Sequence, residues 1–376
     1  MSTPIVADVL NRPFTLQSLK YRALSLPLAG ALVTGAATFH QRDLLLLTAS
    51  IEIDGRQTTG FGEVAPLPGW TGEDLASSRQ MLDTMQAPRR FDRVSELASV
   101  IPESADRPVL HAGLELALLD ALSRHAGQSL ARTLLGNRGD DVLTRIPVQF
   151  TLGACDSDET CRRVAAAYHA GFRVAKLKVG AADPGHDLAR IDRVLAACPD
   201  MTLRLDANGA WSLESALALL QALPADRVEL VEQPVNRADF LALLDAYDGR
   251  GPRIAADESC IGMTDATGLL DDGRVGALVI KPAVVGGLLA AQRLIERAST
   301  DGIQVIISNL MESAIGRMAA AQLAAAWPQL SGPHGLATAD WFARDLSPVA
   351  ERVEKGFLEL PSGPGIGFEP VTADSP

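Results

Sequence analysis

The sequence predicts an α/β protein in which a (β/α)₈, TIM-like barrel follows an N-terminal α+β capping domain. Short β-rich runs recur between residues 146 and 336, and several of the segments between them show helical periodicity. Polar side chains able to do chemistry stand at the ends of five successive predicted strands. Alternating strands and helices imply a parallel sheet, because parallel neighbours need a crossover connection, usually a helix.

Eight runs are predicted to form the barrel strands, and the eighth is the weakest of them. Between two of these runs, apolar residues recur at helical spacing from Leu288 onward, which predicts a helix over residues 287–300. Ser212 suits an N-cap for another helix, over residues 212–223. The predicted strands are residues 146–150, 174–179, 202–206, 228–232, 253–257, 277–281, 304–308 and 333–336.

Residues 1–110 have a different pattern and are predicted to form the capping domain. Residues 44–53 are rich in Leu and Ile and end in Asp54-Gly55, which is a hairpin signal. A turn-rich stretch follows at 66–70, and a helix is predicted to begin near Glu73. Strands and a helix that do not alternate regularly indicate an α+β unit.

The barrel is predicted to span residues 111–349, with a helix at 111–124 that bridges to it from the capping domain. Residues 350–376 are rich in Gly and Pro, and we expect them to pack back on the capping domain. Residues 24–39 predict a strand followed by a glycine-containing loop, since this stretch is too short for a membrane span. The loop, residues 29–38, is a candidate lid over the site; a rigid loop fits it nearly as well.

The bulk composition excludes some classes of partner. A net charge of −12 argues against nucleic acid, which requires a basic surface. No targeting or membrane segment is recognised, so a cytoplasmic protein is expected, whether monomer or homo-oligomer. The four cysteines match no zinc-ligand spacing and are expected to be free thiols in a reducing compartment; they are Cys155, Cys161, Cys198 and Cys260.

Charged side chains close consecutive predicted strands, starting with the second. From Lys178 to the next such residue is 28 positions, and the following intervals are 26, 25 and 24. Each interval is one βα unit, so all these groups reach the same face of the barrel, where active sites form in this architecture. In chain order they are Lys176 and Lys178, Asp206, Glu232, Asp257, and Lys281.

Three carboxylates from neighbouring strands, Asp206, Glu232 and Asp257, predict a metal site. Oxygen-only ligands suit Mg²⁺ better than zinc. Carboxylates this close together also need a cation to offset their repulsion. A single Asp at a strand end is usually a helix N-cap, and a single Lys-x-Lys is usually a surface strand. The regular spacing of the whole set favours the catalytic interpretation.

Lysines on both sides of a metal site suit proton abstraction next to a carboxylate. The deprotonated substrate carries negative charge on oxygen, which a divalent cation and an ammonium group stabilise. The base is expected to be a lysine whose pKa is lowered by a second lysine and by the metal. A small anionic carboxylate is therefore the expected substrate.

The constellation resembles the enolase superfamily, in particular its muconate-cycloisomerase-like subgroup, over nearly the whole chain. The resemblance implies that Lys178 is the acid/base lysine and that Lys281 acts from the opposite face. It implies that Lys176 keeps Lys178 partly deprotonated. It also implies that the three strand-end carboxylates bind Mg²⁺, for which Mn²⁺ can substitute.

Four motifs are similar to those of o-succinylbenzoate synthases, a family of lyases in menaquinone and phylloquinone biosynthesis. This similarity implies syn dehydration of 2-succinyl-6-hydroxy-2,4-cyclohexadiene-1-carboxylate to 2-succinylbenzoate. Ala337 departs from the Asp or Gly that such relatives often carry, which bears on fine specificity. The motifs are residues 60–70, 206–211, 308–316 and 334–338.

The sequence leaves other functions open. An N-acylamino acid racemase, a dipeptide epimerase or a muconate cycloisomerase would use the same metal site and lysines. A non-catalytic barrel that only binds a ligand is a further alternative. Such a protein would be expected to have lost a metal ligand or a lysine, and none is missing.

Several further residues are candidate substrate contacts. Arg204 has the inward parity of Asp206, so it could orient a site residue or form an ion pair in the barrel interior. Backbone amides of Gly286 and Gly287 could bind a carboxylate at a helix N-terminus, or form an ordinary turn. Glu258 is expected to bind a lysine, and His334 to be structural. The complete set is Arg204, Asn208, Gly286, Gly287, Ser308, Asn309 and Glu312.

Overall fold

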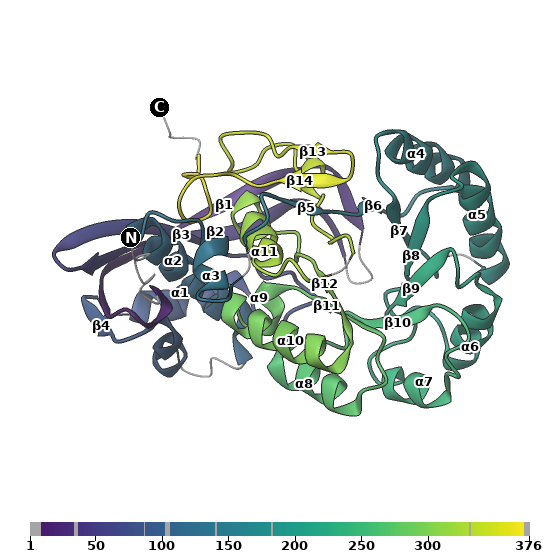
Figure 1. Cartoon of the computed structure of the whole chain (residues 1–376), viewed down its shortest axis with the longest axis horizontal. Coiled ribbons are helices and arrows are strands. Elements are labelled where there is room, and N and C mark those ends of the chain that lie inside the picture. Colours follow the sequence, from purple (N-terminus) through teal and green to yellow (C-terminus); the bar gives the residue numbers. More distant parts are fainter. Residues whose placement is uncertain are drawn as a thin grey trace.

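The computed structural model describes residues 9–33, 37–85, 87–101, 106–139, 141–181, 183–330 and 332–371. It contains an antiparallel sheet of four strands and a parallel sheet of seven. Figure 1 shows the antiparallel sheet with α1, α2 and α3 on one side of the molecule, and the parallel strands with their covering helices on the other. The architecture agrees with the predicted barrel and N-terminal capping domain.

The antiparallel sheet has the order β3-β2-β1-β4. Asp54 and Gly55 connect β2 to β3 and both have positive φ, 51° and 76°, as a tight hairpin requires. The predicted strand and hairpin are thus confirmed. The strands are β1 (Phe14–Val33), β2 (Thr38–Ile53), β3 (Arg56–Val64) and β4 (Arg89–Phe91).

The predicted glycine-containing loop at 29–38 is largely wrong. β1 continues to Val33, and Leu32 and Val33 pair with Phe39 and Thr38. Gly30 falls in an irregular stretch between Pro27, which pairs with Gln41, and Leu32, and the pairing resumes beyond it, as register can after a bulge. Residues 34–36, on which the hypothesis of a lid partly rests, lie outside the described residues.

Helix α2 (Pro108–His125) lies against β3 at very short distance. A Cβ atom at Gly60 would come 2.3 Å from the Ala117 carbonyl oxygen, and one at Gly62 would come 2.1 Å from the Gly113 carbonyl oxygen. Gly60 and Gly62 of the 60–70 motif are therefore required for helix packing. The predicted helix near Glu73 is α1 (Leu75–Thr84), which Asp74 caps by accepting a hydrogen bond from the Ser77 amide.

The parallel sheet has the order β12-β11-β10-β9-β8-β7-β6. Its strands are β6 (Phe150–Leu152), β7 (Val174–Lys178), β8 (Thr202–Asp206), β9 (Val228–Glu232), β10 (Arg253–Ala256), β11 (Ala277–Ile280) and β12 (Gln304–Ile307). β8 and β9 have the predicted bounds, and the predicted strands 174–179, 253–257, 277–281 and 304–308 each end one residue earlier. Five apolar side chains fill part of the interior: Leu230, Ala255, Ala277, Val279 and Ile306.

Helices alternate with these strands, as predicted. Ser212 caps α6, and the helix expected at 287–300 is α10. The helices of this part are α4 (Ser157–His169), α5 (Pro184–Ala197), α6 (Leu213–Ala222), α7 (Phe240–Ala246), α8 (Gly262–Asp272), α9 (Pro282–Val285), α10 (Leu288–Asp301) and α11 (Ala314–Ala325).

The first and eighth predicted strands differ from the structure. Residues 146–150 divide into β5 (Arg145–Pro147), which joins a separate sheet, and the beginning of β6. Residues 333–336 form two isolated bridges, His334 with Val148 and Gly335 with Ser308, and no regular strand. These bridges still link the end of β12 to the chain before β6. Pro333 has no amide hydrogen, which limits the pairing available to this segment.

The C-terminal segment pairs with β5 through β14 (Phe357–Glu359), which forms a hairpin with β13 (Val353–Glu354). Beyond it, the Ile366 amide donates to Asp120 of α2 at 2.6 Å.

The other elements among the described residues are α3 (Leu130–Leu135) and the 3₁₀ turns Val9–Asn11, Val94–Val100 and Ala339–Trp341. All four cysteines are free thiols. No helix within the described ranges has the length and apolar character needed to cross a membrane.

Candidate active site

The parallel pairing places the predicted site residues in one row. Lys178 is opposite Asp206 in the β7–β8 register, and Asp206 is opposite Glu232 in the β8–β9 register. Asp257 and Lys281 follow directly after β10 and β11. The carboxyl ends of five neighbouring strands therefore present their charged side chains on one face of the barrel.

The lysines lie directly against the carboxylates. Lys176 Nζ is 2.8 Å from Asp206 Oδ2 and 2.5 Å from Glu232 Oε1. Lys178 Nζ is 2.7 Å from the same Asp206 oxygen, so two ammonium groups share one acceptor. Lys281 Nζ contacts both oxygens of Asp257, at 2.7 and 2.8 Å. The structure thus brings all six predicted catalytic and metal-binding residues together.

Burial and neighbouring charge shift the pKa values of these groups, and the two effects often act in opposite directions. Burial raises the pKa of Glu232 to about 8; Lys176 opposes the rise, and the charges of Asp206 and Asp257 add to it. Burial would also raise the pKa of Asp206, but Lys176 and Lys178 outweigh it and hold that pKa below its ordinary value. Burial would lower the pKa of Lys176, yet the adjacent carboxylates raise it. The pKa values of these two neighbouring carboxylates are thus shifted in opposite directions, as expected where like charges share a site.

The donor set fits a hard divalent cation. Three carboxylates that are almost fully buried supply only oxygen atoms. Glu258, next to Asp257, has a buried Oε2 with no hydrogen-bond partner among the described atoms. Within the described ranges, no three His, Cys, Asp or Glu side chains are already arranged to hold an ion; the ammonium groups of the lysines lie against the carboxylates instead.

A loop of the N-terminal region reaches this face. The centroid of the Trp70 ring lies 3.6 Å from Lys281 Nζ, in cation–π geometry. Leu67 packs with Val284 and Leu310, which follow β11 and β12. The sequence motif contains this tryptophan, but its contact with the lysine depends on the tertiary structure.

Two buried charged residues fasten that loop to the segment after β12. Arg42 donates to the carbonyl oxygens of Ala65 and Met311, at 2.8 and 3.0 Å. Glu63 accepts from the Ser313 amide at 2.9 Å. Burial raises the pKa of Glu63 to about 7. Sequence reasoning had not singled out Arg42 or Glu63; Glu63 stands in the 60–70 motif, which was its only signal.

Gln233 is a further buried residue to which sequence reasoning gave no role. It is fully buried with a φ of 41°, directly after Glu232. Its Oε1 accepts from the Ser259 amide at 3.0 Å, and its Nε2 donates to Ser259 Oγ at 2.8 Å. It also accepts from the Asp257 amide at 3.3 Å. Gln233 thus links the backbone at Asp257, the third predicted metal ligand, to the end of β9, which carries Glu232.

Arg204 lies away from this row. It donates to Glu229 at 2.7 Å, to the Gln149 side chain at 2.7 Å and to the Pro333 carbonyl oxygen at 2.6 Å. Arg204 stands two residues before Asp206 on β8, and Glu229 is near the start of β9. Of the two roles considered, the interior ion pair is the one that the structure supports, and the contact with a site residue is not formed.

The amides at the start of α10 are also engaged. Gly287 donates to the Pro282 carbonyl oxygen at 2.7 Å, and the Leu289 amide donates to Glu115 of α2 at 3.1 Å. A Cβ atom at Gly287 would lie 2.3 Å from that carboxylate. A buried protein carboxylate thus occupies the place expected for a substrate carboxylate. The Gly286 carbonyl oxygen lies 2.8 Å from the His111 ring nitrogen Nδ1.

The remaining candidates divide into two groups. Asn208 is in the site: its Oδ1 accepts from Lys178 at 2.5 Å, and its Nδ2 donates to Glu258 at 2.8 Å. Glu258 was expected to bind a lysine, and its hydrogen-bond partner is this asparagine instead. The others shape the turn after β12: Ser308 and Asn309 donate to the Gly335 carbonyl oxygen, each at 3.3 Å, and Glu312 accepts from the Leu310 amide.

His334 is structural, as expected. It is 2% exposed, and its Nδ1 accepts from the Ile307 amide at 3.2 Å. Burial lowers the pKa of His334 to about 3, so the ring is neutral and can accept that bond.

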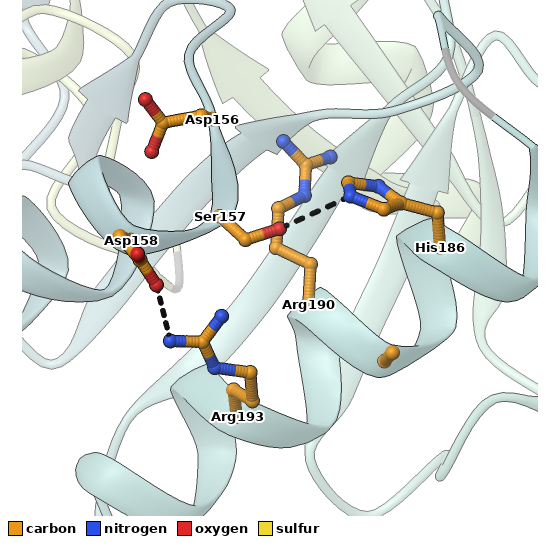
Figure 2. A pocket seen from close by; sticks show the side chains of 7 residues that line it. Asp156, Ser157, Asp158, His186, Arg190 and Arg193 are labelled. Carbon is orange, nitrogen blue, oxygen red and sulfur yellow. Dashed lines mark hydrogen bonds and ion pairs between the residues drawn. The ribbon is translucent and has the colours of Figure 1, made fainter.

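A hollow of about 430 Å³ lies between the start of α4 and one side of α5, outside the row of strand-end groups. Figure 2 shows Ser157 and His186 joined by a hydrogen bond on one side of it and Arg193 turned toward Asp158 on the other. None of the predicted catalytic or metal-binding residues lines it.

A barrel with acidic and basic groups at successive strand ends, covered by an N-terminal domain, defines a class of metal-assisted proton-transfer enzymes. Residues 159–374 match the family described as enolase C-terminal domain-like. The chain therefore belongs to the enolase superfamily, in its muconate-cycloisomerase-like part, and is an enzyme of that superfamily.

Relatives with several activities are similar to this chain. A hydrophobic dipeptide epimerase of Enterococcus faecalis is 33% identical over 85% of this chain and 91% of its own. An N-succinylamino acid racemase of Thermus thermophilus is 29% identical over 94% of each chain. An o-succinylbenzoate synthase of Bacillus subtilis is 26% identical over 92% of each.

The fold comparison agrees with the sequence comparison. The crystal structure of a dipeptide epimerase from Enterococcus faecalis V583, complexed with Mg and the dipeptide L-Leu-L-Tyr, has a TM-score of 0.82. It is 28% identical, and the match covers 94% of this chain and 99% of that one. The identities do not separate synthase, racemase and epimerase, so the superfamily is established and the particular reaction is a separate question.

Proposed function

We propose that this protein is an o-succinylbenzoate synthase, a Mg²⁺-dependent lyase of menaquinone or phylloquinone biosynthesis. The observation that carries the chemistry is the row of buried carboxylates, Asp206, Glu232 and Asp257, with lysines from β7 and from the end of β11 on either side. The substrate would be a small anionic carboxylate with an acidic hydrogen on the adjacent carbon. The four motifs similar to synthases support the choice of reaction.

In this proposal the three carboxylates hold Mg²⁺, with Mn²⁺ as a substitute. Bound there, the ion supplies positive charge that stabilises the negative charge developing on the substrate carboxylate. Asn208 and Glu258 lie beside the site and keep Lys178 and its neighbours in place.

Lys178 is proposed to remove the proton next to the carboxylate. Its side chain is 32% exposed, against 12% for Lys176 and 10% for Lys281, so it is the lysine that a substrate reaches most easily. Lys176 binds the same Asp206 oxygen as Lys178, so one carboxylate holds both ammonium groups beside the proposed metal position. Lys178 then returns the proton to the departing hydroxyl, and formation of the aromatic ring makes this step favourable.

Lys281 is proposed to act as a cation on the other side of the carboxylates. Both Asp257 oxygens and the Trp70 ring lie against its ammonium group, and these contacts fix its position. A fixed positive charge there would offset the charge that develops on the substrate once Lys178 has taken the proton.

The segment that follows the bridge at Gly335 favours the synthase over a dipeptide epimerase, since its first acidic residue is Asp340. A dipeptide substrate carries an ammonium group that needs an acidic partner when it is buried. Leu336, Ala337 and Thr338 follow the bridge that completes the barrel, and none of them is charged. The synthase substrate has no ammonium group and requires no such partner.

The second candidate is an epimerase or racemase acting on dipeptides or N-acylamino acids. The 33% identity with the dipeptide epimerase favours it. Two lysines from opposite sides of the carboxylate row could remove a proton from one face of a carbon and return one to the other. In that case both Lys178 and Lys281 would have to exchange protons with the substrate.

Turnover of freshly prepared 2-succinyl-6-hydroxy-2,4-cyclohexadiene-1-carboxylate, with Mg²⁺ and with EDTA, tests the proposal. We expect metal-dependent formation of 2-succinylbenzoate that is lost in Lys178→Ala. A folded, Mg²⁺-loaded protein that forms no product would contradict the synthase. In that case N-succinylamino acids and dipeptides are incubated in D₂O, where deuterium entering at the α-carbon would identify the second candidate.

A further inference from the structure

The end of β7, which carries Lys178, rests on a buried ion pair in α5. Asp187 and Arg190 are 3% and 7% exposed, and Arg190 Nη2 lies 2.8 Å from Asp187 Oδ1. The positions are three residues apart on the helix, so the two side chains share one face. That face is turned toward the strand.

Both members of the pair bind the backbone around the lysine. Arg190 Nη2 donates to the Lys178 carbonyl oxygen at 2.5 Å. Asp187 Oδ2 accepts from the Gly180 amide at 2.7 Å. Between these two contacts, the Val179 amide donates to the Asp206 carbonyl oxygen on β8 at 2.9 Å. Three consecutive residues are thus held by bonds to α5 on one side and β8 on the other.

The chain has little space to shift at this point. Gly180 has a φ of 86°, and a Cβ atom there would lie 2.8 Å from the Ala210 side chain and 3.1 Å from the Trp211 ring nitrogen. The turn after Lys178 therefore packs closely on the turn after β8. Because interiors are close-packed, the loss of one bond here would displace the strand end as a unit.

Among the residues that the structure describes, Arg190 bonds only to Lys178 and Asp187. Its Nε is buried without a hydrogen-bond partner among the described atoms, although Arg190 lines the hollow between α4 and α5. Arg193, one turn later on the same helix, instead pairs with Asp158 on α4 at 2.6 Å, and both of these side chains are well exposed (Figure 2). The two arginines of α5 thus differ in what they hold.

We propose that Asp187 and Arg190 are positioning residues, which set the backbone of Lys178 so that its ammonium group reaches the reacting carbon. Neither side chain touches the substrate in this proposal. It rests on the proposed role of Lys178 in proton abstraction, which the synthase and the epimerase would share. Small displacements of a reacting group have large kinetic effects, about 10²-fold for 1 Å.

The kinetic test compares Arg190→Met and Asp187→Asn with Arg193→Gln as the matched control on the same helix. We expect kcat to fall about 10- to 100-fold in the first two, with KM changed less than about twofold. We also expect a larger isotope effect on kcat with substrate deuterated next to the carboxylate, because proton abstraction becomes the slow step. Arg190→Lys keeps a donor and should recover part of the loss, and Arg193→Gln should match the wild type.

Hydrogen exchange measured by mass spectrometry tests the same inference without a substrate. Peptides covering residues 174–181 should exchange faster in Arg190→Met and Asp187→Asn, while the rest of the chain stays protected. Asp187→Asn is nearly isosteric, so it serves for the same test if Arg190→Met does not fold. The exchange result stands even if the synthase assay of the wild-type enzyme is negative, so the two proposals can fail separately.

Three results would overturn the positioning role. One is wild-type kcat in Arg190→Met and Asp187→Asn. Another is a lower kcat with an unchanged isotope effect, which would indicate only fewer active molecules. The last is exchange that is unchanged at residues 174–181 or raised throughout the chain.

Discussion

Two sets of buried carboxylates in this protein are stabilised in different ways. The strand-end set, Asp206, Glu232 and Asp257, lies against lysine ammonium groups. The helix-capping set consists of Glu63, Glu73 and Glu115 and accepts hydrogen bonds from backbone amides in the first turns of α11, α2 and α10.

The difference in partners suits the two sets to different roles, one in the reaction and one in holding the fold together. Ammonium groups sit on flexible side chains, so another cation can displace them and a proton can leave them. Helix amides are fixed by the backbone and cannot give way without unfolding a turn. The strand-end set is therefore suited to a metal and a substrate, while the capping set anchors the N-terminal region and α2 to the barrel.

The largest expected effect is on the strand-end set. Lys178→Ala should lower turnover about 10²- to 10⁴-fold, the usual contribution of a general acid or base. The midpoint of urea unfolding should change little, because this lysine is partly exposed. The assay is product formation at saturating substrate, with Lys20→Ala as the surface control. Turnover close to that of the wild type would remove Lys178 from its proposed role.

A divalent cation should stabilise the same set. At Mg²⁺ concentrations about 100 times the dissociation constant, the free energy of unfolding should rise by about 2.7 kcal/mol, and EDTA should reverse the gain. Glu232→Gln should lose most of this effect, whereas the exposed Glu296→Gln should keep it. Thermal unfolding with and without Mg²⁺ or Mn²⁺ measures it. An equal gain in Glu232→Gln would place the cation elsewhere.

The capping set should make stability depend on pH. Burial raises the pKa of Glu115 from 4.5 to about 7, so the folded protein holds this proton more tightly than the unfolded chain. The resulting stabilisation is complete below about pH 4.5 and is lost as pH rises through about 7. The expected loss is on the order of 2 kcal/mol between about pH 5 and 8.

Urea unfolding at several pH values checks this dependence. Glu115→Gln should flatten it without abolishing it, because burial also raises the pKa of Glu63 to about 7. Glu296→Gln, on the outer surface of α10, serves as the control. A wild-type protein that became more stable as the pH rose through this range would contradict the predicted loss of stability.

The smallest effect is expected at Glu73, whose described hydrogen bonds come from two backbone amides at the start of α2. Its oxygens accept from the Val109 and Leu110 amides at 2.7 and 3.0 Å. Glu73→Gln keeps one acceptor and should lower the free energy of unfolding by about 1 kcal/mol. Turnover should be unaffected, since the hydrogen bonds that the structure describes for Glu73 come from the start of α2 and none comes from the strand-end row. A loss of turnover at unchanged stability would contradict the division between the two sets.

The sequence alone determined the strand-end row. The residues recur at intervals of one βα unit, and the parallel pairing then places Lys178, Asp206 and Glu232 opposite one another. Local periodicity carries this information, because strand parity and unit length do not depend on distant partners. The bounds of β8 and β9, the Asp54-Gly55 hairpin and the Ser212 cap were predictable for the same reason.

Only the tertiary structure decided which partners the remaining polar groups have. Arg204 has the right parity for the site but pairs with Glu229. The Gly287 amide, which a substrate was expected to use, donates to the Pro282 carbonyl oxygen, and Glu115 accepts from the Leu289 amide beside it. Gln233, Arg42 and the Asp187–Arg190 pair act through contacts between segments that sequence spacing does not relate. A hydrogen bond between distant segments depends on how whole elements pack, and packing is not encoded in the period of any one of them.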